Sequence, residues 1–306
     1  MWILILILTS GMVFGYVTRR FAFAWVQYVV TCLIWILLFI LGLEVGANES
    51  VVSQFYQLGG SATLVAVCGL IGSMLAARGV QWWVKKSAYY DESQGPVIYE
   101  DESAPSLWGS LIIATWFFFG VALSLWHVLP IDSVPDEVSL VALCLLLAAV
   151  GFSVGHDPAI KEYIHQMHGR LLLLPLMTIL GTLAGVSVLG MLWHKYAVAD
   201  VMATGAGLGY YSLSSILVTQ YKGAELGTVA LLANIIRELI TLLAAPWIVR
   251  FIGPLALVSS GGATSMDTTL PVVSQYAGRR YVGLSIIHGI CCDFSVPFVV
   301  TFLVSM

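Results

Sequence analysis

The chain has 306 residues, of which 59% are hydrophobic and 10% are charged, and its formal net charge is −4. Its mean hydropathy is +0.93. Because charged residues usually make up about a quarter of a soluble domain, this composition excludes a soluble protein and predicts an all-α polytopic membrane protein.

Apolar stretches long enough to cross a bilayer fill the first two thirds of the chain. They cover residues 2–17, 25–43, 59–78, 107–129, 138–155 and 170–193. The first three match the second three at a constant offset of 109 residues. The matched pairs are Gly11 with Gly120, Gly42 with Gly151, Val45 with Val154, Gly46 with Gly155, Gly60 with Gly169, Leu64 with Leu173 and Gly72 with Gly181. Because a unit of three crossings is odd, its copy enters from the opposite side, so the pattern predicts an inverted repeat.

This repeat divides the chain into four parts. We predict a three-helix unit over 1–84, a flexible cytoplasmic linker over 85–106 and a second three-helix unit over 107–195. The linker is assigned from its acidic residues and its Gly-Pro turn. Residues 196–306 then form a substrate-binding core.

The core contains a second repeat, at an offset of 55. The matches are Gly207 with Gly262, Ser214 with Thr269, Val218 with Val273, Gln220 with Gln275, Tyr221 with Tyr276, Gly223 with Gly278, and Glu238 with Asp293. Each copy is a glycine-broken segment, 197–220 or 253–276, followed by an unbroken helix, 225–249 or 281–304. The broken segments are either re-entrant hairpins, giving about eight transmembrane helices plus two hairpins, or full crossings, giving ten spans.

The distribution of Lys and Arg predicts the orientation but not the span count. With both termini in the periplasm, either topology puts ten Lys and Arg inside and two outside. We prefer the hairpins, because the glycines leave about ten residues on either side, which is too short for a span but long enough for a hairpin arm.

Four charged residues lie at membrane depth in the core, namely Arg237, Glu238, Asp267 and Asp293. Such residues are costly in hydrocarbon and indicate a substrate or ion site. Asn234 shares a helix face with Glu238. Two structural alternatives stay open: Arg237 and Glu238 could form a buried charge network that pins two helices, and Asp267 could cap a half-helix.

Short polar side chains flank both glycine breaks. Beside half-helix ends they suit an α-amino or a carboxylate group, although each could equally satisfy a freed backbone carbonyl. They are Ser212, Ser214, Ser215, Thr264, Ser265, Thr268 and Thr269. Tyr211, with Tyr210 and Tyr276, lines a cavity or lies at the membrane interface. His288 is a candidate proton relay, with helix packing as the alternative. We expect no metal site and no cofactor.

Several motifs of the core resemble the bacterial lysine exporter family LysO. They are Gly207–Ser214, Asn234-x-x-Arg237-Glu238, Gly262–Pro271 and His288-Gly289, with Gly42-Leu43-x-x-Gly46 in the first half. The resemblance implies export of L-lysine and toxic analogues across the inner membrane. It also implies two required intramembrane acids, at Glu238 and Asp267, whereas Asp293 is not part of the family pattern.

We therefore expect a secondary-active exporter of lysine-like cationic amino acids rather than an enzyme, with protons as the coupling ion and the lipid bilayer as its surroundings. A homodimer is an open alternative, and no nucleic-acid partner is expected. One rival function is a carrier of small organic anions that uses Arg237 and helix N-termini. The other is an intramembrane hydrolase with Ser212 or Ser265 as nucleophile and His288 as base.

Overall fold

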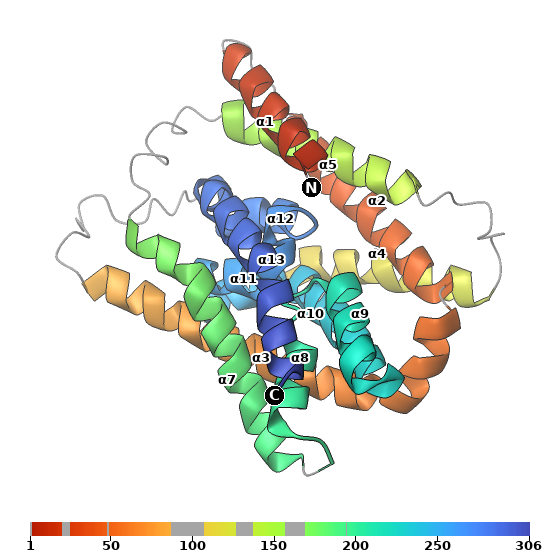
Figure 1. Ribbon diagram of the computed structural model, residues 1–306. Helices are drawn as coiled ribbons and strands as arrows, with labels where there is room; N and C mark the ends of the chain where they lie inside the picture. The colour runs from red at the N-terminus through yellow and green to blue at the C-terminus, as the bar shows by residue number, and fades with distance from the viewer. Residues whose placement is uncertain are drawn as a thin grey trace.

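The structure is a computed structural model that describes residues 2–19, 25–47, 49–86, 107–126, 137–156, 169–193 and 195–306. All regular structure in these ranges is helical (Figure 1), which confirms the all-α class. Most of the predicted linker, residues 87–106, lies outside them. The elements are α1 (Trp2–Val17), α2 (Val26–Ala47), α3 (Glu49–Lys86), α4 (Leu107–Leu125), α5 (Glu137–His156), η3 (Gly169–Leu173), α7 (Leu174–Leu192), α8 (Val198–Gly205), α9 (Tyr211–Lys222), α10 (Ala224–Phe251), α11 (Pro254–Gly261), η4 (Gly262–Met266), α12 (Leu270–Val272), η5 (Val273–Ala277), η6 (Arg279–Tyr281) and α13 (Val282–Val304).

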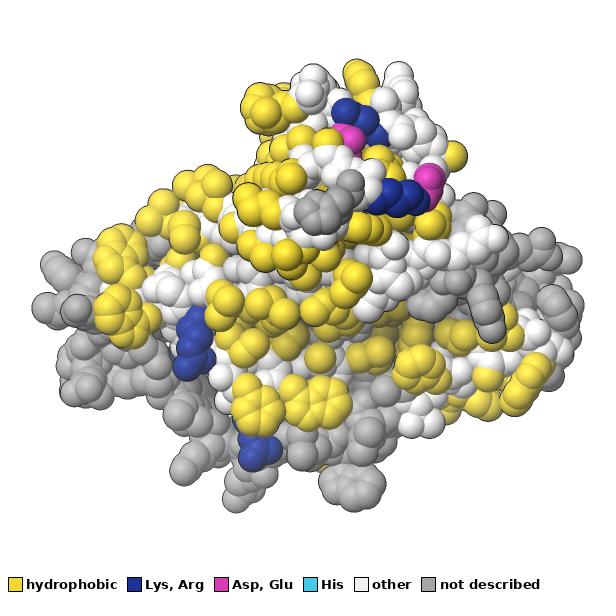
Figure 2. All heavy atoms as spheres, turned by 90° about the horizontal axis from the view of Figure 1, so that it is seen from below, with side chains coloured by type: hydrophobic (Ala, Val, Ile, Leu, Met, Phe, Trp, Pro, Cys, Tyr) yellow, Lys and Arg dark blue, Asp and Glu magenta, His cyan; other side chains and the backbone are white. Residues whose placement is uncertain are grey.

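The described helices have the length and surface of a membrane protein. Four apolar helical stretches are long enough to cross a membrane, namely Gln57–Val84, Leu171–Leu192, Ala224–Phe251 and Arg279–Val304. Four shorter ones are Leu6–Val17, Tyr28–Ile40, Thr115–Leu125 and Val141–His156. Hydrophobic side chains cover much of the described surface in Figure 2. The exposed hydrophobic residues of the described chain include Phe294, Phe298 and Phe302 of α13. The number of spans stays a prediction.

Helices of the first three-helix unit pack on helices of the second. α1 lies along α5, and α2 lies along α4. In the first pair a Cβ added at Gly11 would overlap the backbone of Ala148, and in the second a Cβ added at Gly120 would overlap the backbone of Phe39. At the offset of 109, Gly11 corresponds to Gly120 and Phe39 corresponds to Ala148. The same two repeat positions are therefore in contact in both pairs, and each unit supplies one position in the first pair and the other position in the second.

α3 and α7 form the third pair. They are the third helices of the two units, so here each helix packs on the helix that corresponds to it in the repeat. Gly72 of α3 and Gly181 of α7 lie against each other's backbone, and they too are 109 residues apart. A contact between equivalent positions is expected at a pseudo-two-fold axis. The inverted repeat stays a prediction, and these paired contacts support it.

The first broken segment enters and leaves at the same end of α10. α8 stops at Gly205, and the chain turns through Leu208 and Gly209, whose φ angles are 50° and 95°. α9 then ends at Lys222, whose Nζ lies 2.7 Å from Oδ1 of Asp200, in the first turn of α8. This ion pair brings the two ends of the segment together and favours a hairpin over a full crossing.

The second broken segment starts from the other end of α10. There Nη1 of Arg78, on α3, donates to the carbonyls of Phe251 and Ile252 at 3.2 and 2.8 Å. α11 begins directly afterwards, and Gly262, with a φ of 59°, ends it. The returning arm is shorter than the sequence suggested, because α12 spans three residues and continues as the π-helical turn η5.

A cysteine-labelling experiment tests the hairpins. In a background without native cysteines, single cysteines at positions 195, 222 and 250 are exposed to a membrane-impermeant thiol reagent in intact cells. With hairpins and a periplasmic C-terminus, positions 195 and 222 react and position 250 does not. Full crossings predict reaction at 195 and 250 and protection at 222, a pattern that would refute the hairpin topology. Position 195 is the control, since both topologies place it outside.

Candidate functional site

The two glycine breaks meet in the middle of the core. The backbone N–H of Ala263 donates to the carbonyl of Leu208 at 2.8 Å. A Cβ added at Gly262 would overlap this carbonyl oxygen, so the crossing requires glycine there. The two segments that repeat at an offset of 55 are therefore in direct contact at their breaks.

Asn234 of α10 holds the first break. Its Oδ1 accepts from the N–H of Gly209 at 2.8 Å, and its Nδ2 donates to the carbonyls of Ala230 and Thr204 at 2.8 and 3.2 Å. Nδ2 also lies 3.3 Å from Oγ of Ser214. Asn234 is buried, and its amide satisfies two backbone groups at the break, the N–H of Gly209 and the carbonyl of Thr204.

Arg237 binds the end of α11 and both three-helix units. Its Nε and Nη2 donate to the carbonyls of Ser260 and Ser259 at 3.0 and 3.1 Å. Its Nη1 donates to Oγ1 of Thr182 at 3.1 Å, and its Nη2 donates to Oγ of Ser73 at 3.3 Å. Ser73 and Thr182 are themselves 109 residues apart. A cation is favoured at this helix C-terminus by the last carbonyls of the helix and by the helix dipole.

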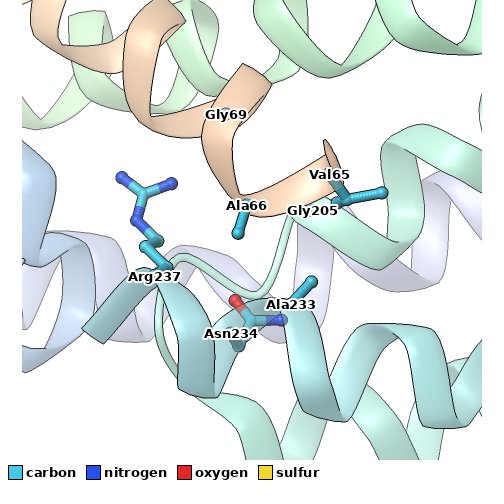
Figure 3. Close-up of a pocket in the computed structure, with 7 residues that line it drawn as sticks. All are labelled: Val65, Ala66, Gly69, Gly205, Ala233, Asn234 and Arg237. Carbon is cyan, nitrogen blue, oxygen red and sulfur yellow. The ribbon is translucent and has the colours of Figure 1, made fainter. Parts of the chain in front are cut away.

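The alternative of an Arg237–Glu238 charge network is not formed within the described ranges, where Arg237 bonds neutral acceptors. Figure 3 shows Arg237 and Asn234 at a small pocket between α10, the end of α8 and α3. Gly69 and Gly205 are among the small residues that line it. The guanidinium thus pins α10 to three other helices rather than presenting itself to an anion.

Three carboxyl groups of the core, those of Glu238, Asp267 and Asp293, interact electrostatically. Oδ1 of Asp267 accepts from the backbone N–H of Thr268 at 2.6 Å and lies 3.5 Å from its hydroxyl. The Thr268 side chain also interacts with Glu238. Asp267 interacts electrostatically with both Glu238 and Asp293, and Thr268 interacts with two of the three acids, Glu238 and Asp267.

The turn that carries Asp267 is clamped to α13. Oγ of Ser265 donates to the carbonyl of Ser285 at 3.0 Å, and Oγ of Ser285 donates to the carbonyl of Ser265 at 2.7 Å. The ring of His288 lies between Ser265 and Thr178, with Nδ1 and Nε2 at 2.8 and 2.9 Å from their hydroxyl oxygens. All four side chains are 0% exposed.

The other predicted hydroxyls mostly bond the local backbone. Thr264 donates to the carbonyl of Gly261 and Thr269 to that of Thr264. Tyr211 and Ser212 are exposed at the start of α9. Sequence reasoning missed Ser73 and Thr182, although these two hydroxyl residues align in the 109-residue repeat.

The Ser265–His288 contact has the spacing of a nucleophile and a base. Neither side chain is exposed, and the hydroxyl of Thr178, rather than a carboxylate, lies against the second ring nitrogen. Ser212 lies far from this histidine in the chain and is exposed. The geometry therefore favours a structural clamp over a hydrolase.

The sequence pattern of the family described as "Lysine exporter LysO" matches residues 5–91 and 114–304. The chain belongs to this family. An Escherichia coli (strain K12) relative named "Lysine exporter LysO" is 25% identical over 312 residues, covering 97% of this chain and 98% of the relative. A Haemophilus influenzae relative, provisionally named as a lysine exporter, is 26% identical over 172 residues, covering 56% of this chain and 86% of its own. No solved structure matches the chain. The resemblance to the LysO family is thus confirmed.

Proposed function

We propose that the protein is a secondary-active exporter of L-lysine and similar cationic amino acids or toxic analogues, working in the inner membrane by exchange for protons. The observation that carries this proposal is the linked pair of carboxyl groups, Glu238 and Asp267, beside the crossing of the two breaks. The lysine exporter LysO family supplies the substrate class.

The acid cluster suits a site that binds either lysine or protons. A lysine ammonium loses its hydration when it enters the core, and a carboxylate compensates this loss by a charge-assisted hydrogen bond. When lysine leaves, a proton can neutralise the same carboxylate. The two ligands then compete for one site, and this competition couples their movements.

Proton exchange also removes the electrical cost of export. Moving one positive charge outward against an interior-negative potential costs about 2.3 kcal/mol per 100 mV. An inward proton for each outward lysine cancels the net charge movement. The proton gradient then drives the exchange.

We assign the α-carboxylate of the substrate to the first turn of α9 rather than to Arg237. Arg237 already donates to four neutral acceptors and is 2% exposed. The first N–H groups of a helix have no partner within the helix and favour an anion. Tyr211 and Ser212 lie in this turn. Periplasmic termini and a homodimer stay predictions.

A counterflow assay tests the proposed function. Purified protein in liposomes loaded with unlabelled lysine should accumulate external radiolabelled lysine, and an imposed pH gradient should drive net lysine movement. Liposomes without protein are the control. No lysine counterflow, together with movement of labelled organic acids, would instead establish the anion-carrier rival.

A further inference from the structure

We propose that His288 is a positioning residue that holds the Asp267 turn and stays neutral throughout transport. This inference rests on the proposed lysine–proton exchange at Glu238 and Asp267. It replaces the sequence-based hypothesis of a proton relay through His288, which lies on α13 and is 0% exposed.

The hydrogen bonds around the ring determine where its proton lies. Oγ of Ser265 is 2.8 Å from the carbonyl of Gly262 and 3.0 Å from that of Ser285. Because carbonyl oxygens only accept, the single hydroxyl proton of Ser265 points to one of them. Its oxygen therefore accepts from Nδ1 of His288, 2.8 Å away. On the other side of the ring, Oγ1 of Thr178 lies 2.9 Å from Nε2 and 2.7 Å from Oγ of Ser259. With the hydroxyl of Ser259 donating to Thr178, the hydroxyl of Thr178 donates to Nε2, and the neutral ring has both nitrogens satisfied.

A second proton on the ring would be a buried charge beside another cation. Within the described part of the chain, the charged and titratable groups around the ring are the guanidinium of Arg237, on α10, and Cys292, one turn along α13. Thr178 and Ser265 contribute only hydroxyls. Burying an unpaired charge is costly, and the positive charge of Arg237 raises that cost.

The neutral ring fixes the position of the acid-bearing turn. The ring of His288 holds Ser265, which precedes Asp267 by two residues. The residue between them, Met266, packs closely on Gly289 of α13, where an added Cβ would lie 2.6 Å from the backbone N of Met266. Asn234 plays the corresponding part at the first break with an amide that does not titrate. Proton binding is then left to the carboxyl groups, while both breaks keep their geometry as pH changes.

Two variants separate positioning from proton transfer. His288→Asn keeps an N–H donor near the position of Nδ1, whereas His288→Ala removes it. In proteoliposomes we expect His288→Asn to retain the wild-type proton-to-lysine ratio and pH profile, and His288→Ala to raise KM for lysine about tenfold, as for loss of one buried hydrogen bond, with the ratio unchanged. Lysine movement without proton movement in His288→Asn would overturn the inference.

A spectroscopic measurement decides the same point without transport. In protein labelled with ¹⁵N-histidine, the signal that is missing from His288→Asn belongs to His288. We expect it to show the neutral ring with the proton on Nδ1 from about pH 5 to 9. An imidazolium signal at the acidic end would overturn the inference. If the wild-type protein moves no protons with lysine, the proposed function fails, and this spectrum still tests the positioning role.

Discussion

Glu238→Gln and Asp267→Asn should each abolish coupled lysine export while leaving the amount of folded protein close to wild type. Both changes keep the shape of the side chain and remove its negative charge. A hydrogen bond to a charged group contributes about 1.5–3 kcal/mol, so the affinity for lysine should fall about 10- to 100-fold. Proton coupling should be lost as well, because an amide does not bind the transported proton. Lysine-driven proton movement in liposomes measures both effects.

Asp293→Asn is the matched control for the two acid variants. Asp293 is the counterpart of Glu238 in the 55-residue repeat and is in electrostatic contact with Asp267, but the Thr268 link joins the other two acids. We therefore expect a smaller loss of lysine flux. Wild-type flux in Glu238→Gln at normal expression would show that the carboxylate of Glu238 is not a coupling site, and the proposed mechanism would fail.

Gly262→Ala should destabilise the protein by about 3 kcal/mol or more. With φ at 59° and ψ at −125°, the residue occupies a backbone conformation that an L side chain rarely adopts, which costs about 1–3 kcal/mol. The new methyl group would in addition overlap the carbonyl of Leu208, where the two breaks cross. Thermal unfolding in detergent should show a lowered midpoint, and lysine counterflow should be lost with it.

Gly60→Ala is the control for this substitution. Gly60 lies within α3, and a Cβ added there has no neighbour within 4 Å. Alanine in a helix is more favourable than glycine by roughly 0.5–1 kcal/mol, so the midpoint should stay the same or rise slightly. An equal loss in the two variants would mean that the Gly262 effect is not specific to the crossing.

The sequence predicted the structure best at residue types that have few possible roles in a membrane protein, namely glycines within apolar segments and charged residues at membrane depth. Glycines in the middle of apolar segments predicted both breaks, and Gly209 and Gly262 indeed adopt positive φ angles there. Charges at membrane depth identified the acid cluster, because such residues need a partner or a ligand.

The partners of Arg237 could not be predicted in the same way. Two of them are backbone carbonyls at the end of α11, and backbone groups leave no trace in a sequence. The other two, Ser73 and Thr182, are small hydroxyl residues of an ordinary kind, and only their spacing distinguishes them. The late start of α12 after the second break has a local cause, since Pro271 lies in its first turn and lacks the N–H that a helix running in from the break would need.

The packing of α1 and α2 on helices of the second three-helix unit has a consequence for biosynthesis. α1 packs on α5 and α2 packs on α4 through backbone contacts that only glycine permits. When the ribosome has completed α1 to α3, neither α1 nor α2 has met its partner. These faces stay open until α4 and α5 have entered the membrane, and Arg237 joins Ser73 to Thr182 later still. We therefore expect a fragment that ends at residue 106 to be degraded when made alone, and to be rescued by co-expression of residues 107–306.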